Sequence, residues 1–256
     1  MVQSTYDTLF SKDITSTGQV SSTPAVTKGK IFDWQNNSPL KLGKQMITIT
    51  AGAQQQKFLV HADLITLQPR IFRRLRISRS VDTGLSSGWF DVYQPVSCSV
   101  FVRLLQFAYH GKLFTGISLD TLWHLYLFAN KNKALDLEDI IMNRIMATYR
   151  SDKQFFPEPR HIELWYKYIK ENSAGRKFLA LCYAAMMHVN TKLPSTSIYN
   201  KEVLVELGKK CDGLLIDVAN LTNGKGSINI SEWDPRYAPE CLYHHHAWGI
   251  ECQNLN

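Results

Sequence analysis

The chain has 256 residues, a net charge of +7 and a hydrophobic share of 45%, which is usual for a folded protein. Its longest apolar run, residues 178–187, is far shorter than the roughly 20 residues that a membrane-spanning helix requires, so the composition excludes such a helix. The first residues lack the apolar core of a secretory signal. The five cysteines are odd in number and widely spaced: Cys98, Cys182, Cys211, Cys241 and Cys252. We therefore expect an intracellular protein, in the cytoplasm or the nucleus, with reduced cysteines and no membrane contact.

The excess positive charge lies in the first half of the chain. Residues 1–137 hold 15 Lys and Arg against 8 Asp and no Glu, whereas residues 138–256 hold 14 Lys and Arg against 14 Asp and Glu. Five arginines fall within ten residues: Arg70, Arg73, Arg74, Arg76 and Arg79. They are candidate contacts for an acidic partner or for nucleic acid. We favour a solvated helix face and loop over nucleic-acid binding, because no base-stacking aromatics or groove-entering motif surround them.

The N-terminal residues 1–43 predict a disordered arm. Twelve of them are Ser or Thr, with Gly and Pro interspersed. Such a stretch buries too little apolar area to offset the entropy lost on ordering. An apolar cluster at residues 31–34 is the exception, and we expect it to pack on the following domain or on a second subunit.

The next segment predicts a hairpin, two short helices and a third strand. Residues 46–50 alternate apolar with hydroxyl side chains, which is typical of a half-buried strand, and residues 58–60 form its partner. Residues 61–75 carry two short apolar helical patterns that are separated at Pro69. Residues 76–88 are rich in Ser and Gly and predict a loop, after which residues 89–93 predict the third strand.

Three helices are predicted after this strand. Ser97 is placed to cap the first helix, and Gly111 to end it. The second begins near Ser118 and breaks within residues 130–133. Asp136 is placed to cap the third. Their apolar positions recur at helical spacing, so we expect them to close on a small mixed core.

These elements and their spaced residues resemble a BTB/POZ domain, and most closely the fungal members of that family. The resemblance covers roughly residues 44–150. It is carried by His61-x-Asp63-Leu64-Ile65, Val96-Ser97-x-x-x-Phe101-x-x-Leu104-Leu105-x-Phe107-x-Tyr109-x-Gly111-x-Leu113, and Leu127-Phe128-Ala129-Asn130-Lys131. Asn130 stands where the family more commonly has Asp. The resemblance implies an α+β fold in which a small, mainly antiparallel sheet is flanked by helices.

The resemblance also implies a function in protein contact. It predicts a non-enzymatic interaction module that self-associates, as a homodimer, and acts as an adaptor or scaffold for protein partners. In the family, His61 and Asp63 would help to line a groove at the two-fold interface and contact a partner peptide. The alternative, which we favour, is that His61 makes a buried hydrogen bond at the junction and Asp63 caps the helix. A second possible function is that of a substrate adaptor for a cullin-type ubiquitin ligase. Relatives with that function tend to carry a hydrophobic-x-Glu element, and residues 75–89 contain no Glu, which weakens the adaptor hypothesis.

The second half predicts an all-helical extension over residues 151–223. Residues 155–159 contain two prolines and predict a linker. An amphipathic helix is expected over residues 162–169, a broadly apolar helix buried on most sides over residues 178–188, and a third, long helical pattern runs over residues 201–222.

The tail, residues 224–256, is irregular and contains a cluster of cysteine and histidine. Cys241, His244, His246 and Cys252 are of the residue types that form a tetrahedral zinc shell. Three consecutive histidines also fit an exposed or packed turn, and similar fungal proteins end in a similar pattern without implying a metal. We favour the turn and assign no metal ligand.

No set of side chains in the sequence predicts catalysis. Cys98 lies at an expected helix N-terminus, where a thiolate is favoured, but nothing places a histidine beside it. His110 precedes the helix-ending glycine and is expected to interact with the helix C-terminus. The glycines near residue 225 lack the Ser or Thr and the helix of a phosphate-binding loop. We expect no enzymatic activity and no cofactor.

Overall fold

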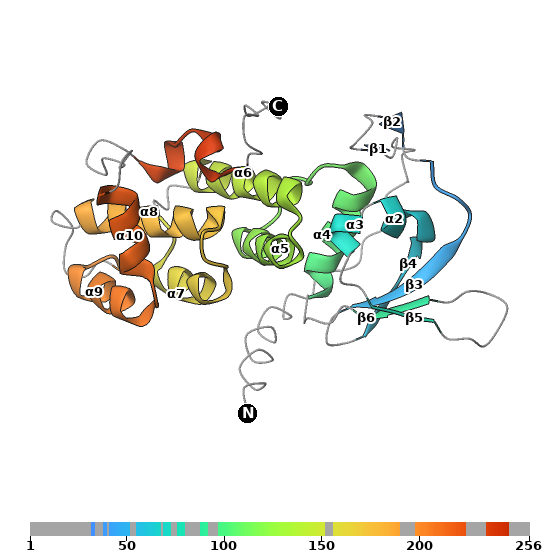
Figure 1. The fold of residues 1–256 in the computed structure, drawn as a ribbon, viewed down its shortest axis with the longest axis horizontal. Helices are drawn as coiled ribbons and strands as arrows, with labels where there is room; N and C mark the ends of the chain where they lie inside the picture. The colour runs from blue at the N-terminus through green and yellow to red at the C-terminus, as the bar shows by residue number, and fades with distance from the viewer. Residues whose placement is uncertain are drawn as a thin grey trace. The chain divides into compact units, whose positions relative to one another are not determined.

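The computed structural model has an α+β arrangement, as predicted. It divides the chain into two compact units, one comprising residues 1–69 and 74–112 and the other residues 70–73 and 113–256. Figure 1 follows the elements along the chain. The structure describes residues 32–33, 38–39, 41–51, 55–67, 69–72, 76–79, 88–91, 97–151, 156–189, 198–223 and 234–245.

The first unit contains a four-stranded sheet in the order β4-β3-β6-β5. The hairpin of β3 (Met46–Ala51) and β4 (Gln56–His61) is antiparallel, with Ile47 opposite Val60. This confirms the predicted hairpin, and the buried side chains of Ile47 and Ile49 account for the alternating pattern of β3. A separate two-stranded antiparallel sheet is formed by β1 (Phe32–Asp33) and β2 (Ser38–Pro39).

The other two strands of the sheet partly correct the sequence prediction. β6 (Gly88–Asp91) lies where the third strand was expected, and it pairs in parallel with β3. The loop prediction for residues 76–88 is wrong at its start, because β5 (Arg76–Arg79) forms there and pairs antiparallel with β6. A four-residue strand carries too little periodicity to be recognised alone, and its ladder exists only once β6 lies beside it.

The helix α4 (Cys98–His110) of the first unit begins and ends as predicted. The Ser97 hydroxyl accepts a hydrogen bond from the backbone N–H of Val100, at 3.4 Å. Gly111 ends the helix with φ of 75°, and its N–H donates to the Phe107 carbonyl at 2.8 Å. The buried face of α4 includes Phe101, whose ring lies 5.0 Å from that of Phe58 on β4. The two predicted short helices are also present, as α2 (Ala62–Leu67) and α3 (Pro69–Phe72).

The second unit is helical. Its elements are α5 (Leu119–Asn132), α6 (Leu135–Ser151), α7 (Pro159–Tyr168), α8 (Ala174–Val189), α9 (Lys201–Lys210), α10 (Leu214–Asn223) and the 3₁₀ turns η2 (Pro235–Tyr237) and η3 (Glu240–Tyr243). Large aromatic side chains fill its core. Trp123 stacks on Trp165, with the ring centroids 6.2 Å apart. The ring centroid of Phe178 lies 6.4 Å from that of Trp123 and 5.4 Å from that of Tyr243.

Local predictions in this unit hold in part. Ser118 caps α5, as expected, whereas Asp136 lies in the first turn of α6 and not at its cap. Pro159 is the first residue of α7 and not part of a linker, since proline fits the first helical position. The long pattern over residues 201–222 is two helices, which are separated around Gly213, whose φ is 79°.

The domain boundary at residue 150 stays a prediction: α6 ends at Ser151, and the two compact units divide the chain between residues 112 and 113, with residues 70–73 also in the second unit. Within the part of the chain that the structure describes, no helix combines the length and apolar composition needed to cross a bilayer.

Candidate functional site

The strand-to-helix junction of the first unit is organised by one hydroxyl group. The backbone N–H of His61 donates to the Tyr109 hydroxyl oxygen at 3.0 Å, and the His61 Nδ1 lies 3.0 Å from the same oxygen. The two rings meet edge to face at 5.8 Å. Partial burial raises the pKa of Tyr109, so this hydroxyl stays protonated and can donate to Nδ1 while it accepts from the backbone. The hydrogen bond expected of His61 is therefore present, and it joins β4 to α4.

Asp63 has a different partner from the expected one. It is the second residue of α2, and its Oδ2 accepts from the backbone N–H of Gly43 at 2.5 Å. A Cβ atom at Gly43 would lie 2.7 Å from the same oxygen, so the close approach suits a glycine. Asp63 thus ties the chain before β3 to the start of α2, and the expected helix-capping role is not what the structure shows.

The arginine run is divided among several elements. Arg70 belongs to α3, and Arg76 and Arg79 are the first and last residues of β5. Because the strand order is β4-β3-β6-β5, β5 is an outer strand of the sheet. Arg73 and Arg74 lie outside the described residues, so the structure does not bring the five arginines together into one described surface.

The opposite outer strand, β4, carries an exposed apolar side chain. Leu59 is 67% exposed, although its neighbour Val60 is fully buried. Outer strands offer unpaired backbone groups to another chain, and natural proteins usually protect them with charge or cover. Leu59 on β4 is therefore a candidate contact for a partner strand, and sequence reasoning did not single it out.

The cysteines and the histidine that were considered for catalysis are hydrogen-bonded, buried or placed at a helix end. Cys98 begins α4, and its Sγ–H donates to the Ala51 carbonyl at 3.4 Å. Burial raises the pKa of the Cys182 thiol well above its usual value and that of Cys211 to about 11. Such thiols are poor nucleophiles near neutral pH. His110 is the last residue of α4, as expected.

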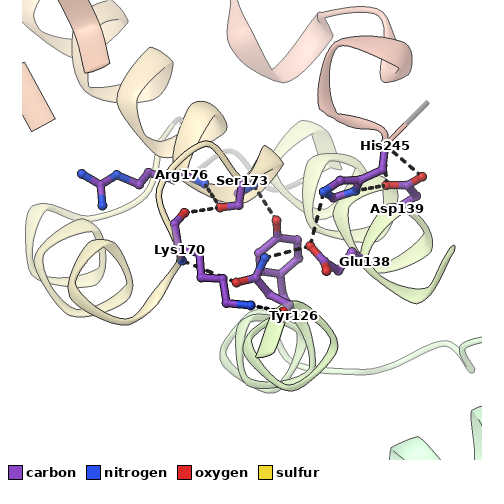
Figure 2. Close-up of polar contacts among 9 residues, drawn as sticks. Tyr126, Glu138, Asp139, Lys170, Ser173, Arg176 and His245 are labelled. Carbon is purple, nitrogen blue, oxygen red and sulfur yellow. Dashed lines mark hydrogen bonds and ion pairs between the residues drawn. The ribbon is translucent and has the colours of Figure 1, made fainter. Parts of the chain in front are cut away.

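A polar network inside the second unit was missed by the sequence analysis (Figure 2). At its centre is Glu138 of α6, whose side chain is 1% exposed. Its Oε2 accepts from the Asn130 Nδ2 at 2.9 Å and lies 3.6 Å from the Nε2 of His245. Burial raises the pKa of Glu138, and the contacts with Asn130 and His245 act against that increase. Glu138 lies three and four residues before the buried Ile141 and Met142, and this placement on the apolar helix face could have identified it.

Neighbouring groups of the network join α5 to the start of α8. The Lys170 Nζ donates to the Asn130 carbonyl at 3.2 Å, and the backbone N–H of Gly175 donates to the Tyr126 hydroxyl at 2.7 Å. Burial raises the pKa of Tyr126, so this phenol stays neutral. The Ser173 hydroxyl donates to the Lys170 carbonyl at 2.8 Å.

The described part of the Cys and His cluster points toward α6. His244 Nε2 lies 2.6 Å from the Oδ1 of Asn143, while Cys241 is exposed. His246 and Cys252 lie outside the described residues. Among the residues that are described, no group of three or more His, Cys, Asp or Glu is arranged to hold a metal ion. We assign none of these side chains as a metal ligand.

A shallow groove of about 760 Å³ lies between α7 and α9. Its lining includes Pro159, Val203 and Leu207, together with four glutamates: Glu158, Glu163, Glu202 and Glu206. Three of these are already paired with Arg160, Lys210 and Lys209, so the groove has little unbalanced charge to attract a ligand.

Comparison of the chain with protein-family models, with curated proteins and with solved structures found no match. The interpretation of the site therefore depends on the sequence and on the geometry described above.

Proposed function

We propose that this chain is a non-enzymatic protein–protein interaction module of the BTB/POZ type, which self-associates and acts as an adaptor or scaffold. The observation that carries the proposal is the contact between His61 and Tyr109. Both residues belong to the pattern that resembles the family, although 48 residues separate them. Their contact supports the idea that the two parts of the pattern serve one fold.

The outer strand β4 supports self-association. Leu59 exposes most of its side chain on a strand whose outer edge can pair with another chain. If a second copy paired with this edge about a two-fold axis, the same interface would cover the Leu59 side chain of each protomer.

Light scattering on the full chain, over about 1 to 100 μM, tests this proposal, because an interface with a Kd of about 1 μM or tighter would give mostly dimer in the upper part of that range. Leu59→Lys should shift the chain toward monomer. Ile216→Lys is the matched control, since Ile216 on α10 is 65% exposed and the variant introduces the same charge outside the sheet. A monomer at all concentrations would contradict self-association, and equal dimerisation of both variants would contradict the role of β4.

A second candidate function is binding of nucleic acid through residues 70–79. It is favoured by the position of Arg76 and Arg79 on the outer strand β5. Binding to duplex DNA should then weaken steeply as salt increases, because counterions are released on association. Absence of binding at low salt would exclude this candidate.

A further inference from the structure

Residues 234–245, here called the C-terminal strap, lie across α6 and α8 in the second unit. Tyr243 is fully buried and packs edge-on against Phe178 of α8, at 5.4 Å. The Arg150 Nη2 donates to the Ala238 carbonyl at 3.4 Å, and the Lys177 Nζ donates to the Leu242 carbonyl at 3.2 Å. The body of the strap is thus held by apolar packing and by hydrogen bonds from cations to neutral carbonyls.

The end of the strap is held differently, by one imidazole between two carboxylates (Figure 2). The backbone N–H of His245 donates to both carboxylate oxygens of Asp139, at 3.0 and 3.2 Å. Its Nδ1 lies 2.9 Å from the Asp139 Oδ1, and its Nε2 lies 3.6 Å from the Oε2 of Glu138. All three of these ionisable side chains are at least half enclosed, and Glu138 is almost completely so.

The chemistry of the three groups requires a proton on the Glu138 side. An ionised carboxylate only accepts hydrogen bonds, so the contact with Asp139 places a hydrogen on Nδ1 of His245. The contact with Glu138 is then favourable when a proton lies either on Nε2 or on Oε2. When that proton is absent, a nitrogen lone pair faces a buried carboxylate whose charge has no neutralising partner on the histidine.

Other titratable groups around the pair do not replace this proton. Tyr126 of α5 is a neutral phenol, and the Lys170 Nζ is directed to the Asn130 carbonyl, from which it acts on Glu138 only as a minor charge. His244 of the strap faces the neutral amide of Asn143. Lys177 of α8 is bound to the strap backbone, and burial lowers its pKa.

We propose that Glu138 and His245 form a proton-operated latch, which holds the end of the C-terminal strap on α6 while one proton lies on the pair and releases it when that proton leaves. This is a conformational device of the second unit and is independent of the proposed function.

The direction of the switch follows from both partners. The hydrogen bond to Asp139, together with Glu138, raises the pKa of His245 above its ordinary 6.5, and burial raises the pKa of Glu138 above its ordinary 4.5. A group with a raised pKa contributes stability that is complete below its unfolded pKa and is lost as the pH rises through its folded pKa. The latch is therefore closed in mild acid and opens as the pH rises from 6.5 through the raised pKa of His245.

Hydrogen–deuterium exchange of the full chain tests the latch. After correction for intrinsic exchange, protection of the strap's last residues, 240–245, should be lost progressively between about pH 6 and pH 8.5, as the pH passes from the ordinary pKa of histidine through the raised pKa of His245. Amides in the middle of α8 should stay equally protected over this range. Flat protection of the strap in the unmodified chain would overturn the proposal.

Two variants and one matched control make the test specific. Glu138→Gln removes the buried charge and should weaken the pH dependence while the strap stays protected at the alkaline end; the part that remains comes from the hydrogen bond to Asp139, which this variant keeps. His245→Gln should give weaker but pH-independent protection, and it decides the question if Glu138→Gln does not fold. His244→Gln, at the adjacent histidine that faces an amide, should keep the full pH dependence. Full pH dependence in Glu138→Gln or His245→Gln, or its loss in His244→Gln, would show that the pair is not the latch.

Discussion

Gly175→Ala is the substitution whose effect follows most directly from the structure. Gly175 is the second residue of α8, and its N–H donates to the Tyr126 hydroxyl at 2.7 Å. A Cβ atom at this position would lie 2.6 Å from Cε1 and 2.8 Å from Cζ of the Tyr126 ring. That ring is fully buried and packs edge-on against Trp123, with the ring centroids 5.8 Å apart, so it cannot move aside without disturbing the core.

The expected loss of stability combines three contributions. Overpacking of a well-packed core costs about 1–3 kcal/mol. Displacement of Tyr126 leaves the buried backbone N–H of residue 175 without its acceptor, which costs about 1–3 kcal/mol more. Alanine regains about 1 kcal/mol over glycine in a helix. The free energy of unfolding of the variant should therefore be about 1–5 kcal/mol lower than that of the unmodified chain.

Chemical denaturation monitored by circular dichroism measures this loss, and Tyr126→Phe separates its parts. The phenylalanine variant removes the hydroxyl but keeps the ring, so on that background Gly175→Ala should cost only the overpacking contribution, less the gain in helix propensity. A Gly175→Ala chain that is as stable as the unmodified one, or more stable, would refute the reasoning, because helix propensity alone would then govern the position.

Other outcomes follow from the same structure. Tyr109→Phe removes the hydroxyl that joins β4 to α4 and should cost about 1–3 kcal/mol in chemical denaturation, whereas Tyr237→Phe, at a 63% exposed tyrosine, should have little effect. Asp217→Asn weakens the ion pair with Arg176, at 2.7 Å, and the hydrogen bond from the Tyr166 hydroxyl. It should lower the free energy of unfolding by about 1–3 kcal/mol and increase hydrogen–deuterium exchange in α10. An unchanged exchange pattern would show that Asp217 does not hold α10 in place. A pull-down with a cullin N-terminal domain should show no specific binding, since residues 75–89 contain no Glu, and micromolar binding would prove this expectation wrong.

The candidate site could be predicted from the sequence only in part. His61 was identified because it belongs to the pattern that resembles the family, and a hydrogen bond at the junction was the expected alternative to a partner contact. Its partner Tyr109 lies on another element, and Asp63 binds Gly43 twenty residues earlier in the chain. Neither pairing follows from local spacing, because each depends on how α4 and the residues before β3 pack against the junction.

The buried network shows the same limit more strongly. Glu138 is the first glutamate in the chain, and its burial follows from its position on the apolar face of α6. Its contact with His245 joins residues that are 107 positions apart, so no window of sequence contains both. The interpretation of the tail histidines as a turn did not specify that the side chains of His244 and His245 reach α6.

Elements with local signals could be predicted without knowledge of the packing. The caps at Ser97 and Ser118 and the ending of α4 at Gly111 are set by hydrogen bonds within a few residues, and the alternation at the start of β3 reflects the burial of Ile47 and Ile49. The strand Arg76–Arg79 and the contact between Glu138 and His245 depend instead on how distant segments pack together. A β-ladder forms only when a partner strand lies beside it. The pKa of Glu138 is raised only when other parts of the chain bury its side chain. Both conditions are supplied by segments that are distant in the sequence.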